Sequence, residues 1–153
     1  MAGTIDARLA ELGLTLPDAP APAANYVPFV RAGDLLFVSG QISQGPAGLI
    51  KGRLGETMDG AEGAEAARRC GLSLIAQARA ALGDLDRVVR VVKLTGFVNS
   101  TPDFTDQPKV INGCSDLMVA VFGEAGRHAR AAVSAPALPL GVAVEIEAVF
   151  QVA

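Results

Sequence analysis

The chain has 153 residues, half of them hydrophobic and 19% charged, with a net charge of −3 and a pI of about 5.1. This is the size of one ordinary domain with ample apolar sequence for a core. The acidic balance and the lack of a Lys/Arg stripe argue against a nucleic-acid or membrane surface. No apolar run reaches the roughly 20 residues that span a bilayer, and the chain does not begin with the basic and apolar regions of a signal peptide. We therefore expect a cytoplasmic protein.

The first 23 residues are predicted to form an arm ahead of the domain. Ile5–Leu14 places its apolar residues on one side, which is typical of a short amphipathic helix. Pro17–Pro22 then breaks the helix and predicts an extended linker. The pattern changes before Tyr26, so we predict an arm over residues 1–23 and a single domain over residues 24–153.

A strand, a turn at Gly33-Asp34 and a second strand are predicted over residues 27–40. A short further strand is possible at Leu49-Ile50. An aspartate with a glutamate three residues later predicts a capped helix over residues 59–82. Gly83 is placed to end that helix.

The second half of the chain repeats these element types. Val88–Val98 is rich in β-branched residues and predicts a strand. After a polar loop, apolar residues at helical spacing predict a helix over residues 108–122. Arg130–Ala135 and Val142–Val152 predict two final strands.

In the two long strands at residues 88–98 and 142–152, apolar residues occupy both odd and even positions, which point to opposite faces of the sheet. This pattern indicates at least partial burial on both faces. Two helices can cover only one face of the sheet, so we expect a neighbouring subunit to cover the other. In the last strand, Glu145 and Glu147 fall on the face opposite the helices.

Arg130 and Glu145 are the strongest candidates for chemistry. Arginine can bind a carboxylate through two parallel hydrogen bonds, and a half-buried glutamate can hold or activate a water. Together they suggest a site for a small acid. The plainer alternatives are a surface ion pair for Arg130 and an ordinary solvated carboxylate for Glu145.

Four other polar residues each have a structural and a functional interpretation. Tyr26 either closes a pocket or packs against its own strand, and Ser39 either binds a ligand or caps its turn. No GxSxG elbow surrounds Ser39, which argues against a serine nucleophile. Asn112 is either a ligand-binding residue or solvated helix surface. For His128, an exposed loop residue is favoured over a general base.

The remaining motifs argue against a cofactor. A single histidine without clustered cysteines argues against a zinc site, and no P-loop or GxGxxG points to nucleotide binding. Cys70 and Cys114 lie far apart in helix-like sequence, where a small buried thiol is the plain interpretation. We expect neither a metal nor a cofactor.

Taken in order, several segments resemble the RidA/YjgF family of reactive-intermediate deaminases, also named endoribonuclease L-PSP. The resemblance covers about residues 24–153 and is closest to a divergent, longer branch. It lies in Leu35–Gln41, Ala76–Leu82, Val88–Lys93, Arg130 with Leu138-Pro139, and Val144–Ala148.

This resemblance implies an α+β, chorismate-mutase-like fold. A mixed sheet of about six strands carries two long helices on one face. It also implies a homotrimer with ligand sites in clefts between subunits. The implied activity is hydrolysis of 2-imino or 2-enamino acids to 2-keto acids and ammonia, without a cofactor, metal or nucleic-acid partner. A non-catalytic trimer that binds small carboxylates in the same cleft is the alternative.

The family's site residues transfer position by position. Arg130 matches the arginine that grips the substrate carboxylate, and Glu145 matches the carboxylate that positions water. Tyr26, Ser39, Asn112 and Ala132 match substrate-binding pocket positions. The chain departs from the deaminase pattern in three places: Ala132 replaces a cysteine, Ala131 replaces a polar residue, and Val27-Pro28 follows the tyrosine.

Overall fold

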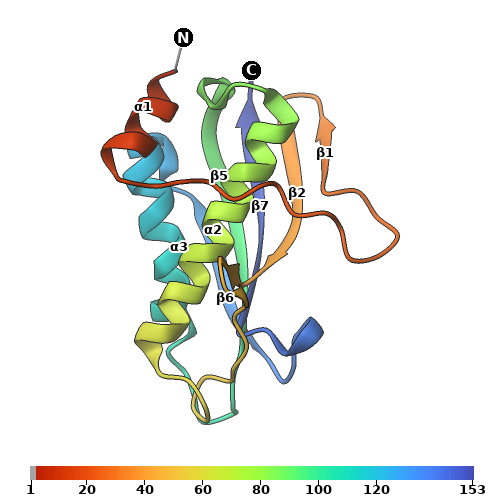
Figure 1. The fold of residues 1–153 in the computed structure, drawn as a ribbon, viewed down its shortest axis with the longest axis vertical. Helices are drawn as coiled ribbons and strands as arrows, with labels where there is room; N and C mark the ends of the chain where they lie inside the picture. The colour runs from red at the N-terminus through yellow and green to blue at the C-terminus, as the bar shows by residue number, and fades with distance from the viewer. Residues whose placement is uncertain (1–2) are drawn as a thin grey trace.

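A computed structural model describes residues 3–153, which form three α-helices, two of them packed on a five-stranded sheet (Figure 1). The helices are α1 (Thr4–Glu11), α2 (Gly60–Leu82) and α3 (Gln107–Phe122), with short turns η1 (Leu85–Arg87), η2 (Gly123–Gly126) and η3 (Pro139–Gly141). The strands are β1 (Phe29–Ala32), β2 (Leu35–Ile42), β3 (Gln44–Gly45), β4 (Gly48–Leu49), β5 (Val88–Asn99), β6 (Ala129–Ala135) and β7 (Val144–Val152).

The main sheet has the order β1-β2-β7-β5-β6. Only the β5–β6 pair is parallel, because α3 carries the chain back across the sheet between these two strands. The predicted α+β class, with two long helices on one face, is confirmed. The expected sheet of about six strands has five, because the short β4 pairs with β3 in a separate hairpin.

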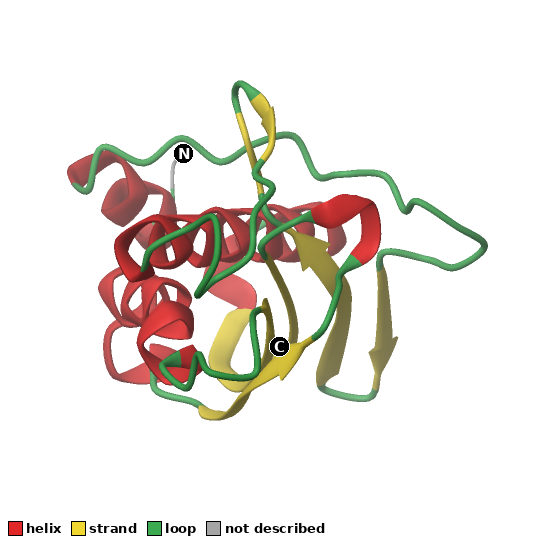
Figure 2. Cartoon of the chain, turned by 90° about the horizontal axis from the view of Figure 1, so that it is seen from below, coloured by secondary structure: helices red, strands yellow, loops and turns green. Residues whose placement is uncertain are grey.

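The face of the sheet beneath α2 and α3 forms the core (Figure 2). Alternate strand residues point into it, as the period of two predicts. All of the following are at most 3% exposed: Leu36, Val38, Val91, Leu94, Val98, Val144, Ile146, Ala148 and Phe150.

Helix α2 begins with the predicted capping box. The Glu62 backbone N–H donates to Asp59 at 2.8 Å, and the Asp59 N–H donates to the Glu62 carboxylate at 3.1 Å. Helix α3 approaches α2 closely where it carries Gly113, since a side-chain carbon there would overlap the Ala64 carbonyl. Glycine at this crossing therefore lets both helices reach the sheet.

The opposite face of the sheet carries no helix, and we call it the open face. It is formed by Phe37, Thr95, Phe97, Val133, Glu145, Glu147 and Val149, which cross-strand pairing places on one side. Phe37 is 45% exposed and Val133 is 44% exposed. The prediction that Glu145 and Glu147 lie opposite the helices is confirmed by the alternating burial of β7.

The amino-terminal arm lies along the helices, on the side away from the sheet (Figures 1 and 2). Its helix α1 is capped by Asp86, which accepts hydrogen bonds from the Thr4 and Ile5 backbone N–H groups at 2.8 Å each. These two bonds lower the pKa of Asp86. Leu9 and Leu16 are buried in the core cluster. The domain boundary near residue 24 stays a prediction.

Candidate functional site

Arg130 lies on β6, at the edge of the sheet, and its side chain reaches α3. Nη1 donates to Asn112 Oδ1 at 2.8 Å and to Ser115 Oγ at 3.1 Å, and Nη2 donates to the Pro108 carbonyl at 3.1 Å. All three acceptors belong to one helix, so the guanidinium is held in place by its own chain. We call Arg130, Asn112, Ser115 and His128 the edge cluster.

The bonding of Arg130 leaves donors for a ligand. A guanidinium has five N–H groups, and among residues 3–153 its bonds occupy both of those on Nη1 and one on Nη2. The Nε–H and the second N–H of Nη2 remain. Two neighbouring N–H donors are what a carboxylate accepts in bidentate binding.

His128 completes the edge cluster through Ser115. Its Nδ1 lies 2.6 Å from the Gly126 carbonyl, which can only accept, so Nδ1 carries the proton. In the neutral ring Nε2 is then an acceptor, and it lies 2.8 Å from Ser115 Oγ. The Ser115 hydroxyl therefore donates to His128 and accepts from Arg130.

The sequence favoured an exposed loop position for His128, but the structure places its side chain in a partly buried environment. The residue is half-buried, and burial lowers its pKa, with the nearby Arg130 charge acting in the same direction. The neutral form is the one that the Ser115 bond requires. Sequence reasoning did not identify Ser115, although its position three residues after Asn112 places both on one side of a helix.

Ala132 lies on the same side of β6 as Arg130, two residues further along, and pairs with Gly96. It is packed against the core, so this side of β6 presents a methyl group two residues after Arg130. Ala131 is exposed on the other side of the strand. On the Arg130 side of β6, Ala132 therefore presents only a methyl group.

Glu145 lies on the open face, supported by an irregularity in β2. The pairing of β2 with β7 shifts register between Val38 and Gln41, and a side-chain carbon on Gly40 would overlap Glu145 Oε2. Burial raises the pKa of the Glu145 carboxyl, and the charge of Glu147 adds to the shift. A carboxyl group shifted in this direction is better suited to proton transfer near neutral pH.

Ser39 has a structural bond in this chain. Its hydroxyl donates to the Val27 carbonyl at 2.7 Å, and its backbone N–H donates to the Pro28 carbonyl at 2.9 Å. These two bonds attach the segment after Tyr26 to β2. Tyr26 itself is 47% exposed, ahead of β1.

The candidate residues fall into two groups on opposite faces of the sheet. Arg130 pairs with the core residue Leu94 on β5, whereas Glu145 pairs with Phe97 of the open face. Strand β5 separates them. One chain brings Asn112 to Arg130, but it does not bring Glu145 to Arg130.

Other reactive groups are few in the described part of the chain. Residues 3–153 contain no group of three or more His, Cys, Asp or Glu side chains placed to hold a metal ion. Within the same residues, no helix is both long and apolar enough to cross a membrane. Cys70 and Cys114 are free and buried, and burial raises the pKa of Cys114 to about 12. Both thiols are therefore protonated core groups, as predicted.

Comparison with known proteins gives the family. Residues 6–150 match the family described as "YjgF/chorismate_mutase-like, putative endoribonuclease". Protein TCP17 of Trypanosoma cruzi is 52% identical over 151 residues, which cover 97% of this chain and 94% of TCP17.

Solved structures agree with that match. A protein of Shewanella oneidensis, described as a "putative endoribonuclease", superposes with a TM-score of 0.94 at 34% identity and covers 98% of this chain and 100% of its own. That coverage includes the arm. RidA from Psychrobacter sp. PAMC 21119 superposes with a TM-score of 0.61 at 29% identity, covering 88% of this chain and 94% of its own. The chain belongs to the RidA/YjgF family.

Proposed function

We propose that this protein hydrolyses 2-imino or 2-enamino acids to 2-keto acids and ammonia, in a cleft between two copies of the chain. The observation that carries the proposal is the fixed guanidinium of Arg130, which keeps two N–H donors for a substrate carboxylate. Membership of the family that includes RidA also supports hydrolysis of this kind.

The reaction needs little beyond positioning. Arg130 holds the substrate carboxylate, which fixes the adjacent imine carbon. Glu145 holds a water, accepts a proton from it as the oxygen adds to that carbon, and gives this proton to the former imine nitrogen. In the resulting carbinolamine, the hydroxyl proton passes through Glu145 to the nitrogen, and ammonia leaves as the C–N bond breaks and the carbonyl forms. Proximity and general acid–base help lower the barrier, because an imine is already electrophilic.

A second copy of the chain supplies the missing half of this site. Arg130 and Glu145 lie on opposite faces within one chain, so Glu145 of a neighbour would have to face Arg130. The open face, with Phe37 and Val133 exposed, is the apolar surface that such an assembly would bury. We propose a homotrimer, in which each interface places one edge cluster against one open face.

A coupled assay tests the activity directly. An amino-acid oxidase generates imino acids in situ, and ammonia or keto-acid release is followed with and without the protein. Wild-type protein should accelerate hydrolysis, and Arg130→Ala should remove the acceleration. Arg127→Ala is the matched control, since that exposed arginine pairs only with Glu124 among the described residues. No acceleration by wild-type protein with several imino acids would refute the enzymatic proposal.

A non-catalytic carboxylate-binding trimer is the second candidate. Ala131 and Ala132 favour it, because they stand where the family resemblance places polar residues, and Ala132 offers only a methyl group on the Arg130 side of β6. Calorimetry with small keto acids would support this function if it showed binding that requires Arg130, in a protein that gives no turnover.

The endoribonuclease in the family's description has less support in this chain. Its pI is about 5.1, and the open face presents two glutamates rather than a basic stripe. RNA cleavage that survives purification and is lost in Arg130→Ala would reverse this ranking. The buried, free cysteines suit the reducing cytoplasm that we propose as its location.

A further inference from the structure

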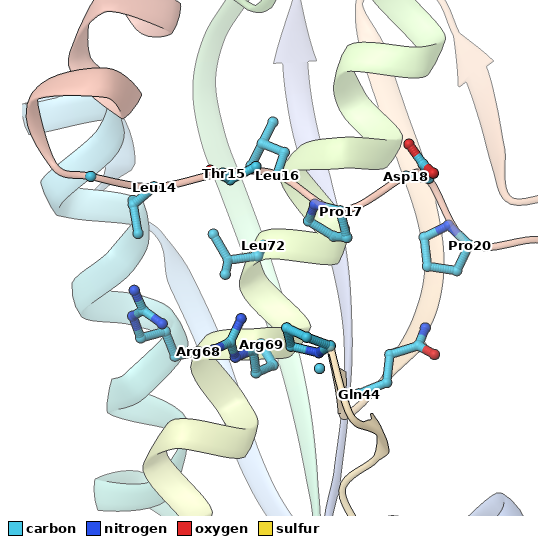
Figure 3. A pocket seen from close by; sticks show the side chains of 13 residues that line it. Leu14, Thr15, Leu16, Pro17, Asp18, Pro20, Gln44, Arg68, Arg69 and Leu72 are labelled. Atoms are coloured by element: carbon cyan, nitrogen blue, oxygen red, sulfur yellow. The ribbon is translucent and has the colours of Figure 1, made fainter.

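A cavity beside the amino-terminal arm includes neither Arg130 nor Glu145 in its lining. It has a volume of about 610 Å³ and three walls, shown in Figure 3. Arm residues 13–20 form one wall, residues 44–46 of the β3–β4 hairpin form the second, and Arg68, Arg69 and Leu72 of α2 form the third. We call this cavity the arm pocket. Its volume is in the range that accommodates a small organic molecule.

Two arginines give the arm pocket a cationic end. Arg68 donates from Nη1 at 3.3 Å, and Arg69 from Nε at 3.1 Å, to the same oxygen of Glu65. Among residues 3–153, each guanidinium thereby uses one of its five N–H groups. Two positive charges thus share one negative charge, and most of their donors stay available. Asp18 lies at the other end of the pocket from Arg68 (Figure 3).

The rest of the arm pocket is mainly apolar. Leu14, Pro17 and Pro20 line it from the arm, and Leu72 lines it from α2 (Figure 3). A bare inorganic ion would leave these side chains uncovered. A molecule with an anionic head and an apolar body would pair with the arginines and also cover the apolar wall.

The arm is held in place on both sides of the pocket. Leu16 is buried against the core. At the far end, the buried Gln77 donates to the Pro20 carbonyl at 2.7 Å. The cavity is therefore fixed before a ligand arrives, which lowers the entropic cost of binding.

We propose that the arm pocket is a second binding site, for small organic anions with an apolar body such as medium-chain carboxylates. It lies on the outer side of the helices, away from the open face, so the trimer proposed above would leave it accessible. The proposal does not depend on the deaminase activity, because no residue is shared between the two sites.

Calorimetry with octanoate as the probe tests this site, with uncharged octanamide as a ligand of matched shape. Wild-type protein should bind octanoate saturably, with one site per chain, and about tenfold more tightly than octanamide. The double variant Arg68→Gln/Arg69→Gln should bind octanoate no better than octanamide. Lys51→Gln, which removes an exposed charge elsewhere, should behave as wild type. Thermal melting of each variant confirms that it is folded.

A variant of the other site separates the two proposals. Octanoate binding that persists in Arg130→Gln and is lost in the double variant supports the arm pocket, whatever the result of the deaminase assay. Binding that is lost in Arg130→Gln but kept in the double variant overturns the proposal, as does the absence of saturable octanoate binding. Equal binding of inorganic phosphate would contradict the assigned ligand class.

Discussion

The edge cluster and the open face differ in how far one chain completes them. In the edge cluster, Arg130 has three acceptors on α3, and the chain continues through Ser115 to His128. On the open face, burial and the charge of Glu147 raise the pKa of Glu145, and the large apolar side chains of Phe37 and Val133 remain exposed on the same face. The edge cluster is thus organised within one chain, whereas the open face keeps apolar side chains in contact with solvent and two neighbouring carboxylates that repel each other.

This difference suggests a division of labour. A preorganised cation costs little reorganisation when a ligand binds, which suits the anchoring of a carboxylate. An apolar face with a half-buried carboxylate gains most from a partner that buries it and supplies an opposite charge. We infer that the edge cluster of a single chain is already arranged to bind a carboxylate, and that the open face becomes functional only when a second chain packs against it.

The largest effect is expected from placing a charge on the open face. Phe37→Glu should dissociate the proposed trimer, because an unpaired buried charge costs about 3–5 kcal/mol. Sedimentation should then show a monomer, and imine hydrolysis should fall to the background rate. Leu49→Glu, at an exposed leucine outside the main sheet, is the control. A Phe37→Glu protein that keeps the mass and activity of wild type would contradict the role of the open face.

The next effect concerns Glu145 alone. Glu145→Gln should lower turnover by about 10²–10⁴-fold, the usual range for a general acid–base group. Keto-acid binding, measured by calorimetry, should change little because Arg130 is untouched. Equal losses of binding and turnover would mean that Glu145 anchors the substrate rather than activates water.

Glu145→Gln should also change how the folding stability of the dissociated monomer depends on pH. The native pKa of Glu145 lies above its ordinary value of 4.5, so native protein holds this proton more tightly than unfolded protein. Stability therefore falls as pH rises from about 4.5 through the native pKa. In a Phe37→Glu background, Glu145→Gln should raise the Tm at pH 7 and leave it unchanged near pH 4. In the assembled protein a neighbour's Arg130 should reduce this gain.

A smaller effect is expected from Gly40→Ala. The added methyl group would occupy the space of Glu145 Oε2, and the flexible carboxylate can move aside without unfolding the sheet. We expect kcat to fall about tenfold, on the order of 1.4 kcal/mol, with KM nearly unchanged. Gly60→Ala, at the start of α2, where an added methyl group meets open space, controls for the loss of a glycine. A change in KM alone would show that the bulge positions substrate instead.

The smallest effect concerns His128 and pH. Its native pKa lies below 6.5, so unfolded protein binds this proton first and stability falls as pH drops below about 6.5. Protonation also removes the acceptor for Ser115, which loosens Arg130. Pyruvate affinity, measured in a Glu145→Gln background, should therefore fall a few-fold at low pH, about 1 kcal/mol for one hydrogen bond. His128→Gln should flatten this dependence, and parallel pH profiles would refute the link.

The local elements of this fold could be read from the sequence because their signals are local. Alternation along β7 assigned Glu145 and Glu147 to the face opposite the helices. The Asp59–Glu62 spacing marked the start of α2, and Gly83 marked its end. Each of these depends on residues within a few positions of one another, where backbone geometry leaves few choices.

The surroundings of α2 could not be read in the same way. Apolar spacing predicted one buried face, yet residues 71–78 are all buried, because the arm covers the side away from the sheet. The run from Leu72 to Gln77 carries no charge, which was the available signal. The meaning of this uncharged run depended on where a segment much earlier in the chain would pack, as in the bond from Gln77 to Pro20, 57 residues apart.

For the candidate site, the sequence determined residue types and faces and singled out Arg130 and Glu145, and the resemblance assigned roles to these two residues and to Asn112. Only the tertiary structure showed that α3 delivers Asn112, Ser115 and the Pro108 carbonyl to Arg130, and that Gly40 makes room for Glu145. It also separated Arg130 from Glu145 by strand β5. The physical reason is that the backbone of a single helix or strand sets the spacing at which its side chains return to the same face. Strand order, register and helix crossover are instead set by packing between segments far apart in the chain.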